Sequence, residues 1–391
     1  MTWNTFEIVS LFVLIFCFIA QLFFYWIVMA KPYYCMQSAG REELQNLGTQ
    51  SPVSVIISTK NSNHDLFRFL PNILEQKYPE FEVIVVTDGI SDEGEEALKQ
   101  LKNHYPNLYS THVPDDTKNV SRKKLAITLG IKAAKYDKLL FTEPDSYIPT
   151  ENWIYLMSRH FSDKKTIVLG FSAIENAKNL LQKYMAYDYF VSNLQMISFA
   201  LFNHPYAGNG RNMAYEKSHF VEQKGFVKHR SLQQGEDDLF INEIATRENT
   251  AIEISAQSLV LSEASDFYDW KRYKVNRTST KRLYKKGPVA FWRLESFTRI
   301  GFLSAFVACF VYGLSYIFPI NFLLPGIAFI CFAVWLFSQF IVINKTLEQL
   351  QLEKFYLTVF LFDLFQPFIN LYFYIYCMLR AKENYTYRYE K

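Results

Sequence analysis

Two carboxylates separated by one proline, Glu143-Pro144-Asp145, closely follow the apolar run 139–141. A short apolar run that ends in acidic residues is typical of a buried parallel strand whose carboxyl end opens into a site. Paired carboxylates are hard oxygen ligands that suit Mg²⁺ or Mn²⁺ shared with a diphosphate. A cation bound there would neutralise a departing nucleotide. The alternative is an acidic turn in solvent, since such pairs are common in loops.

A second acidic group, Gly235-Glu236-Asp237-Asp238, stands at the start of a predicted helix. Like charges this crowded can raise the pKa of one carboxyl and suit it to base catalysis. Alternatively, these acids only cap the helix. Upstream, the stretch 208–214 (Gly-Asn-Gly-Arg-Asn-Met-Ala) combines glycines that permit close backbone approach with a cation. By itself this stretch would be a turn.

Strands and helices that alternate along the chain must position these groups. Strands are predicted over 53–59, over 81–86 and immediately before Glu143, with helical periodicity between them. Such alternation predicts a mostly parallel sheet of the α/β class. Ligands of these sheets bind beyond the carboxyl ends of the strands. Thr59, Asp88 and the acidic pair all lie at those ends.

Composition divides the chain into a membrane part and a soluble part. Of the 391 residues 50% are hydrophobic, but 8–30 and 301–344 contain no charged residue. One span needs about 20 apolar residues, so the first stretch predicts one helix and the second predicts two, with a turn near Pro319. The N-terminal span lacks a preceding Lys or Arg and a cleavage site, which favours a retained anchor over a signal peptide.

The soluble part is predicted to be cytoplasmic. Lys31 and Arg41 follow the first span and only Glu7 precedes it, which fits the positive-inside rule. A further crossing at 355–379 would place the basic tail outside, so a bent, re-entrant segment is an equal alternative. Asp363 would face protein in either case, because a charge exposed to lipid is costly.

Composition argues against a site built from cysteines and against nucleic acid as a partner. Four of the five cysteines lie in apolar segments and the fifth just beyond one, so neither a disulfide framework nor a zinc site is indicated. A net charge of +3 is too small to argue for nucleic acid.

The ordered set of motifs resembles family-2 glycosyltransferases from about Pro52 to Ser262. The segments that carry the likeness are 53–61, 78–88, 123–130, 142–149, 208–214 and 235–239. The resemblance implies a GT-A fold, Rossmann-like and mostly parallel, with one N-terminal and two to three C-terminal transmembrane helices. It also implies inverting transfer from a nucleotide sugar.

Roles for individual residues follow from the same resemblance. Asp237 corresponds to the catalytic aspartate, Asp145 to the metal-binding acid and Glu143 to the first acid of the D-x-D motif. Donor binding is implied for Thr59, Asp88, Lys123, Lys124, Glu143 and Arg277, and an acceptor-side or loop role for Gly208, Asn209, Gly210, Arg211 and Glu236.

Three departures from the family pattern matter. The first acid of the metal motif is Glu143 rather than Asp, and Asp88 stands where the family has an acidic pair. Many membrane synthases also carry a QxxRW motif, and the corresponding stretch here keeps only the cations Lys274 and Arg277. The missing tryptophan weakens a processive interpretation. Arg277 is expected to stabilise the leaving diphosphate, or alternatively to face lipid headgroups.

These observations predict a multi-pass protein of the plasma or inner membrane that transfers one sugar from a UDP-like donor to the hydroxyl of a lipid or lipid-linked saccharide. Its expected partners are the donor, that acceptor and the bilayer, and its cofactor is Mg²⁺ or Mn²⁺. The alternatives are a processive polysaccharide synthase or a catalytically silent scaffold. The predicted domains are an anchor (1–30), a linker (31–50), the GT-A domain (51–265), an amphipathic interface segment (266–299) and a C-terminal membrane region with a basic tail (300–391).

Overall fold

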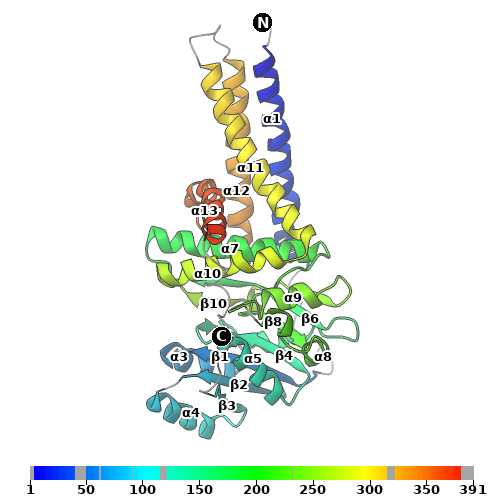
Figure 1. Cartoon of the computed structure of the whole chain (residues 1–391), viewed down its shortest axis with the longest axis vertical. Helices are drawn as coiled ribbons and strands as arrows, with labels where there is room; N and C mark the ends of the chain where they lie inside the picture. Colours follow the sequence, from blue (N-terminus) through cyan, green and yellow to red (C-terminus); the bar gives the residue numbers. More distant parts are fainter. Residues whose placement is uncertain are drawn as a thin grey trace. The chain divides into compact units, whose positions relative to one another are not determined.

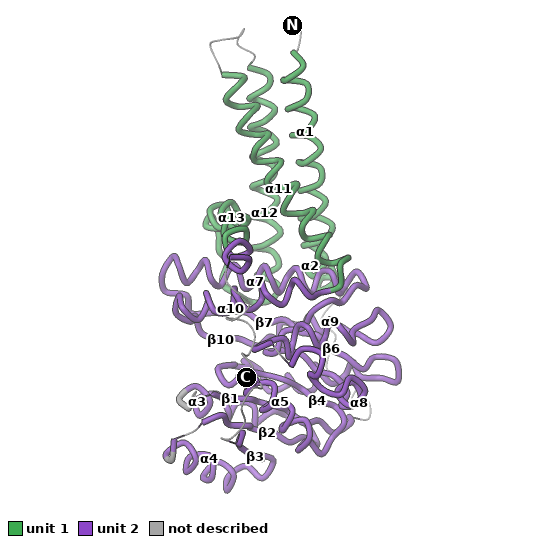
Figure 2. Tube along the Cα trace, in the orientation of Figure 1, with its two compact units in different colours: residues 1–37, 285–372 green, residues 38–284, 373–391 purple. Residues whose placement is uncertain are grey.

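The structure is a computed structural model that describes residues 4–39, 50–60, 63–89, 91–114, 121–230, 232–314 and 322–379. The predicted turn near Pro319, Arg41 and the basic tail lie outside these residues. The chain forms two compact units (Figure 2). Unit 1 comprises Met1–Gln37 and Lys285–Tyr372, and unit 2 comprises Ser38–Tyr284 and Phe373–Lys391.

Unit 2 is built on a seven-stranded, mostly parallel sheet with the order β3-β2-β1-β4-β8-β6-β9 (Figure 1). Strand β8 runs antiparallel to both of its neighbours, and the other pairs are parallel. The strands are β1 (Val53–Lys60), β2 (Phe81–Asp88), β3 (Leu108–His112), β4 (Lys138–Thr142), β6 (Ile167–Gly170), β8 (Met213–Glu216) and β9 (Thr250–Glu253). The predicted α/β class with a mostly parallel sheet is confirmed.

The register of the central strands brings polar residues to one edge. Thr59 of β1 lies opposite Thr87, and Lys60 lies opposite Asp88. On the other side of β1, Ile57 pairs with Thr142, the last residue of β4. The three carboxyl ends therefore open at the same edge, as the sequence predicts.

Helices cover this sheet, and a smaller sheet, β5-β10-β7, stands beside it. The helices are α3 (Asn63–Leu74), α4 (Asp92–His104), α5 (Arg122–Ala133), α6 (Trp153–Ser158), α7 (Leu180–Leu201), α8 (Lys217–Glu222), α9 (Asp238–Ile244) and α10 (Phe267–Thr280), and the added strands are β5 (Ser146–Tyr147), β7 (Ser172–Glu175) and β10 (Val260–Glu263). The aromatic-rich helix α7 belongs to the core, because Tyr187 and Phe190 are almost fully buried.

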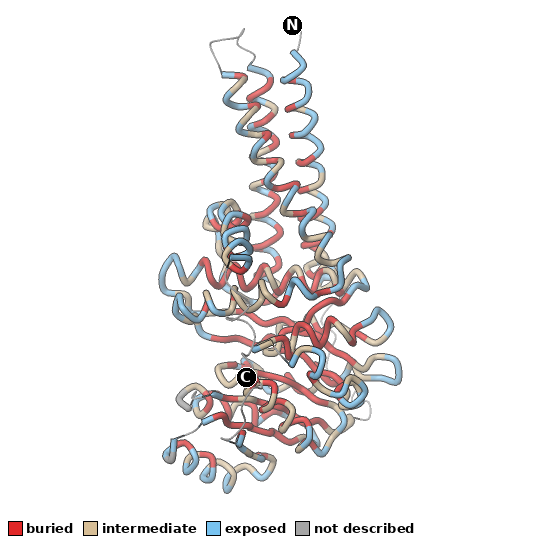
Figure 3. The backbone as a smooth tube through the Cα atoms, in the orientation of Figure 1, coloured by how far each residue is buried: buried red, intermediate tan, exposed pale blue. Residues whose placement is uncertain are grey.

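β-Branched residues of the central strands form the core of unit 2. Val55, Ile57 and Val85 are fully buried in one cluster with apolar residues of α3 and α6. Val and Ile suit a pleated surface that is packed on both faces. Figure 3 shows this buried layer between exposed helix faces. The rigid sheet fixes the positions of the loops that follow its strands.

Unit 1 consists of long apolar helices. They are α1 (Thr5–Leu22), which continues through the π-helix Phe23–Met29 into α2 (Lys31–Ala39), then α11 (Lys286–Gly313), α12 (Leu323–Gln349) and the first part of α13 (Thr358–Leu379). Among the described residues, four stretches are long and apolar enough to cross a membrane: Thr5–Ser38, α11, α12 and α13. This agrees with one N-terminal and up to three C-terminal spans. Apolar side chains such as Phe12 and Phe337 point outward, as lipid-facing residues do.

The helices of unit 1 do not all run in one direction. Figure 1 shows α1, α11 and α12 along their lengths, whereas α13 is seen nearly end-on. Helix α13 thus runs across the other three. This arrangement bears on the two alternatives for 355–379, because a helix that lies across the bundle is not a fourth parallel span.

A buried ionic cluster joins these helices and corrects one prediction. Arg299 of α11 pairs with Asp363 of α13 (3.0 Å) and with Glu295, and the hydroxyl of Tyr25 donates to Asp363 (2.7 Å). Arg299 is 2% exposed, so it does not face lipid headgroups, as a residue of the predicted interface segment 266–299 would. Asp363 faces protein, as predicted. A buried charge is stable only when it is paired.

The predicted interface segment 266–299 is not a single element, because its two parts belong to different units. Helix α10 ends at Thr280 in unit 2, whereas α11 begins at Lys286 and continues without a break past Arg299 to Gly313. The charges Arg293 and Arg299 do not interrupt the helix, because one is exposed and the other is paired within the bundle.

Candidate active site

The acidic pair that follows β4 is held by cations. Asp145 receives a bidentate ion pair from Arg211, with Nη1–Oδ1 2.5 Å and Nη2–Oδ2 2.8 Å. Burial alone would raise the pKa of Asp145, but the adjacent guanidinium outweighs it and lowers that pKa. Arg211 comes from the Gly-Asn-Gly-Arg loop, which connects the acidic pair to the second predicted motif.

Lys123 links the acidic pair to the second acidic group. Its Nζ lies 2.7 Å from Glu143 Oε1 and 2.9 Å from Glu236 Oε1. Burial would lower the pKa of Lys123, but Glu143, Glu236 and Asp237 together raise it. One lysine at the start of α5 thus balances carboxylates from two motifs that are far apart in the sequence.

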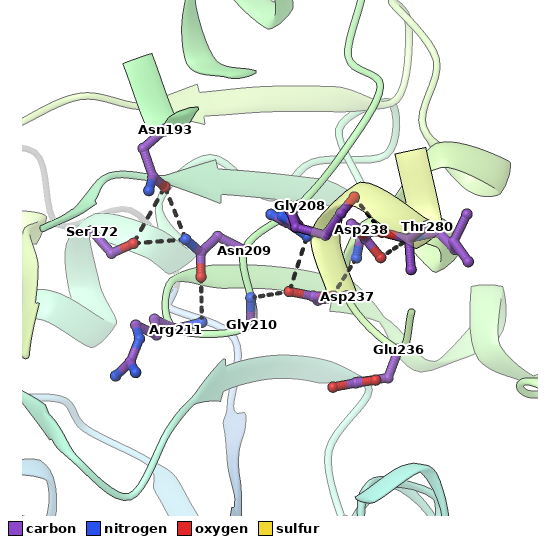
Figure 4. Close-up of polar contacts among 12 residues, drawn as sticks. Ser172, Asn193, Gly208, Asn209, Gly210, Arg211, Glu236, Asp237, Asp238 and Thr280 are labelled. Atoms are coloured by element: carbon purple, nitrogen blue, oxygen red, sulfur yellow. Dashed lines mark hydrogen bonds and ion pairs between the residues drawn. The ribbon is translucent and has the colours of Figure 1, made fainter. Parts of the chain in front are cut away.

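Asp237, at the N-terminus of α9, is held by two backbone N–H groups (Figure 4). Its Oδ2 accepts from Gly210 (3.1 Å) and its Oδ1 from Asp238 (2.6 Å). Arg277 Nη1 approaches Oδ2 at 3.5 Å. The side chain keeps 23% of its surface exposed, so a reactant can reach the carboxylate.

The pKa values of the two neighbouring aspartates, Asp237 and Asp238, are shifted in opposite directions. Burial would raise the pKa of Asp237, but Arg277, Lys123 and the two backbone hydrogen bonds lower it. For Asp238, burial and the charge of Asp237 prevail and raise the pKa. Thr280 and Tyr284 donate hydroxyl hydrogen bonds to Asp238. The crowded charges therefore raise the pKa of the buried neighbour, while the reachable carboxylate stays ionised.

Arg277 of α10 points into this site and not toward lipid. Its Nη1 lies 3.0 Å from Asp238 Oδ2, and its Nη2 donates to the carbonyl of Gly208 (2.9 Å). The side chain is 15% exposed. It therefore ties α10 to the glycine loop and to both aspartates. The predicted contact with a leaving diphosphate stays a prediction.

Gly210 stands between the two acidic groups. A Cβ added there would lie 3.3 Å from Glu143 Oε1 and 3.7 Å from Asp237 Oδ2. Both oxygens consequently face the same point of the backbone. This is where the acid of the β4 motif and the acid of the α9 motif converge.

Sequence reasoning did not find the network that orients the glycine loop. The amide nitrogen of Asn209 donates to Ser172 Oγ (2.9 Å), Tyr189 OH (2.8 Å) and Asn193 Oδ1 (2.9 Å). The Asn209 Oδ1 accepts from the backbone of Arg211 (3.1 Å). Figure 4 shows Ser172 and Asn193 around this amide. These partners are isolated polar residues of β7 and α7, so no local motif marks them.

The edge formed by β1 and β2 offers unsatisfied polar atoms. Thr59 and Asp88 are buried, and among the described residues Thr59 Oγ1 and Asp88 Oδ2 have no hydrogen-bond partner. The other oxygen of Asp88 accepts from Arg122 Nε (2.5 Å). Buried polar atoms of this kind require an explanation, and a ligand that pairs with them is one.

Lys124 lies away from the other predicted donor-binding residues. Its Nζ donates to the carbonyls of His229 (2.6 Å) and Leu232 (3.0 Å). Burial lowers the pKa of Lys124 to about 8. The structure thus brings together Lys123, Glu143, Glu236 and Asp237, whereas Lys124 holds the loop that leads to them.

The carboxylates of the acidic pair fit a cation that is shared with a substrate. Among the described residues, no three His, Cys, Asp or Glu side chains form a complete metal cage. Mg²⁺ is commonly bound by one or two carboxylates plus substrate phosphates and water. Asp145 and Glu143 supply such oxygens, provided that Arg211 and Lys123 release them.

The comparisons with known proteins agree with this geometry. Residues 54–232 match the family described as Glycosyl transferase family 2. The chain carries a family-2 glycosyltransferase domain. The predicted family is thereby confirmed for this domain.

Curated relatives of this chain are polysaccharide synthases by name. Poly-beta-1,6-N-acetyl-D-glucosamine synthase of Staphylococcus aureus (strain COL) is 24% identical over 170 residues, which cover 42% of this chain and 40% of that protein. The synthase of the same name from Staphylococcus epidermidis is 24% identical over 167 residues, or 42% and 38% of the two chains. The likeness thus spans about two fifths of each relative.

A solved structure shares the fold over almost the whole chain. It is a mannosyltransferase from Pyrobaculum calidifontis in complex with GDP-Man and Mn²⁺, with a TM-score of 0.56 and 15% identity. The match covers 94% of this chain and 99% of that chain. At this identity the likeness shows the fold alone.

Proposed function

We propose that this glycosyltransferase transfers a sugar from a nucleotide-sugar donor to an acceptor hydroxyl at the membrane, with inversion at the anomeric carbon. The observation that carries the proposal is the convergence of Glu143 and Asp237 on Gly210. A donor-side acid and an acceptor-side acid that face one point suit a reaction with one leaving group and one nucleophile.

Donor binding is assigned to the edge formed by β1, β2 and β4. The buried, unsatisfied oxygens of Thr59 and Asp88 are suited to the base and ribose of the nucleotide. A Mg²⁺ or Mn²⁺ ion, when bound at Asp145 and Glu143, would stabilise charge on the diphosphate. Arg211 and Lys123, once released from these acids, are placed to pair with phosphate oxygens. The nucleotide and Mn²⁺ in the fold neighbour support this assignment by analogy.

Asp237 is assigned as the base that accepts the proton of the acceptor hydroxyl. Its two backbone hydrogen bonds fix the carboxylate, and its lowered pKa keeps it ionised at neutral pH. The hydroxyl oxygen then attacks the anomeric carbon as the bond to the diphosphate breaks. Direct displacement from the opposite face inverts that centre and needs one base.

A lipid or lipid-linked saccharide is the proposed acceptor, because the described part of the chain contains four candidate spans. Polymer synthesis is the second candidate, and it is favoured by the names of the curated relatives. Mass spectrometry of intact products, made from a panel of nucleotide sugars and a membrane lipid extract, separates the two. One added sugar supports single transfer, a ladder supports polymerisation, and no product contradicts both.

For the membrane topology we propose three crossings, with unit 2 in the cytoplasm. Helices α1, α11 and α12 cross, and α13 lies across them. An odd number of spans leaves the basic tail on the side of Lys31, as the positive-inside rule requires. A cysteine placed at Tyr389 in sealed, inside-in vesicles should be protected from an impermeant thiol reagent. Labelling of that cysteine would establish a fourth crossing.

A further inference from the structure

A cavity opens in unit 2, and none of the residues of the two acidic groups lines it. It measures about 460 Å³ and lies between α5 and the segment from α8 to residue 230. Its lining includes Lys132, Phe220, Val221, Lys224, Val227 and Arg230. Cavities of this size hold small molecules in many proteins. None of the residues assigned to catalysis lines it.

The charge of the cavity is of one sign. Five described lining residues are Lys or Arg, and none of the described lining residues is acidic. Lys217 and Lys124 donate to backbone carbonyls. The side chains of Lys132, Lys224 and Arg230 make no ion pair or hydrogen bond to the described residues. Glu222 of the same segment does not line the cavity, and Glu243 is bound by Lys228 and His229.

Apolar side chains complete the cavity. Phe220 and Phe226 are buried and pack edge to face, with ring centroids 5.3 Å apart. Val221 and Val227 also line the cavity and remain 66% and 57% exposed. Unpaired cations next to exposed branched side chains would be stabilised by a ligand that has both a charged and an apolar part.

We infer that this cavity binds a phosphorylated molecule with an apolar body. The phosphate would be held by Lys132, Lys224 and Arg230, since a guanidinium and two ammonium groups match its two negative charges. The apolar body would cover Val221 and Val227. The ligand is either a soluble phosphorylated metabolite or an acidic membrane lipid, which share this chemistry.

The wall of this cavity leads directly to the proposed base. Lys124 holds the carbonyls of His229 and Leu232, and the hydroxyl of Ser121 donates to the carbonyl of Gln233 (2.6 Å). Asp237 follows four residues later. A ligand that binds Arg230 together with Lys132 of α5 would restrain the segment that leads from Arg230 to Asp237. This part of the inference rests on the proposed role of Asp237.

Lysine footprinting of the full chain in neutral detergent tests the site without an activity assay. Acetylation of Lys132 and Lys224 is followed by mass spectrometry with three probes: 1-naphthyl phosphate, nanodiscs containing dioleoyl phosphatidic acid, and inorganic pyrophosphate. Protection of both lysines by naphthyl phosphate establishes a soluble ligand, and protection by phosphatidic acid alone establishes a lipid. Equal protection by pyrophosphate would overturn the role of the apolar surface, and no protection would overturn the site.

Two variants test whether binding of the probe depends on the cavity. Arg230→Gln should weaken binding of the protecting probe about tenfold, since a charge-assisted hydrogen bond is worth about 1.4 kcal/mol or more. The matched control is Lys228→Gln on the same segment, whose side chain faces Gln223 and Glu243 outside the cavity. Equal losses in both variants would overturn the site. Slower hydrogen exchange in 233–240 with bound probe supports the link to Asp237, and unchanged exchange there overturns that link.

Discussion

Arg211 occupies both carboxylate oxygens of Asp145, at 2.5 and 2.8 Å. The residue proposed to bind the metal is therefore already paired with a protein cation. Asp145 can bind a cation only after this bidentate pair opens. In the proposed cycle the donor diphosphate replaces Asp145 as the partner of Arg211, so that the ion and the donor bind together.

Replacing Arg211 should accordingly strengthen metal binding by the free enzyme. We expect Arg211→Gln to bind Mn²⁺ roughly tenfold more tightly without nucleotide, because a competing charge-assisted pair is removed. Paramagnetic resonance of free Mn²⁺ measures this directly. Arg272→Gln, which removes an exposed pair with Asp269, is the control. Unchanged or weaker Mn²⁺ binding in Arg211→Gln would show that Arg211 does not compete for the site.

A methyl group at residue 210 should separate the two acidic groups. Gly210→Ala places a Cβ at 3.3 Å from Glu143 and 3.7 Å from Asp237, a tight fit that crowds the space where the acceptor must approach. We expect turnover to fall about 100-fold with little change in thermal stability, since a small misplacement near the reacting atoms is costly. Gly287→Ala, where no atom lies within 4 Å, controls for glycine replacement. Near-normal turnover of Gly210→Ala would place the reaction elsewhere.

The pH profile distinguishes the two roles open to Arg277. Burial would raise the pKa of Asp237, and the charge of Arg277 opposes this effect and lowers that pKa. Removing that cation raises the pKa of the base, so the acid limb of kcat/KM for Arg277→Gln should move to higher pH. A limb that does not move, with a raised KM for the donor, would indicate that Arg277 binds the diphosphate instead.

The ionic cluster of unit 1 should be essential for stability. Arg299→Met leaves the carboxylates of Glu295 and Asp363 buried without their cation, which costs about 3–5 kcal/mol. Thermal unfolding of the detergent-solubilised protein measures the loss. Arg293→Met removes an exposed arginine from the same helix and should have little effect. Similar losses in both variants would mean that the cluster contributes nothing specific.

Local patterns were sufficient to predict the strands and the edge where the site lies. β-Branched runs such as 53–59 suit buried parallel strands, and their polar ends must meet at one edge. The partners of the acids could not be predicted, because Arg211 and Asp145 are 66 positions apart and their contact depends on how β8 inserts beside β4.

Charges at the ends of apolar runs were the hardest to interpret. Arg299 adjoins the charge-free stretch 301–344, and such residues are usually placed at headgroups. In the structure Arg299 is buried instead, because it pairs with Asp363 of a helix that lies 64 positions later in the sequence. Periodicity reveals which face of a helix is apolar, but it does not show which distant charge pairs with a buried one.

The most direct test of the account compares the unaltered protein with Asp237→Asn by mass spectrometry of intact products, with nucleotide sugar, Mn²⁺ and acceptor extract present. The asparagine keeps the size of the side chain but cannot accept the proton, so we predict that sugar transfer falls by about 1,000-fold or more while calorimetry shows donor affinity largely retained. Product formation by Asp237→Asn at a rate near that of the unaltered protein would contradict the assignment of Asp237 as the base.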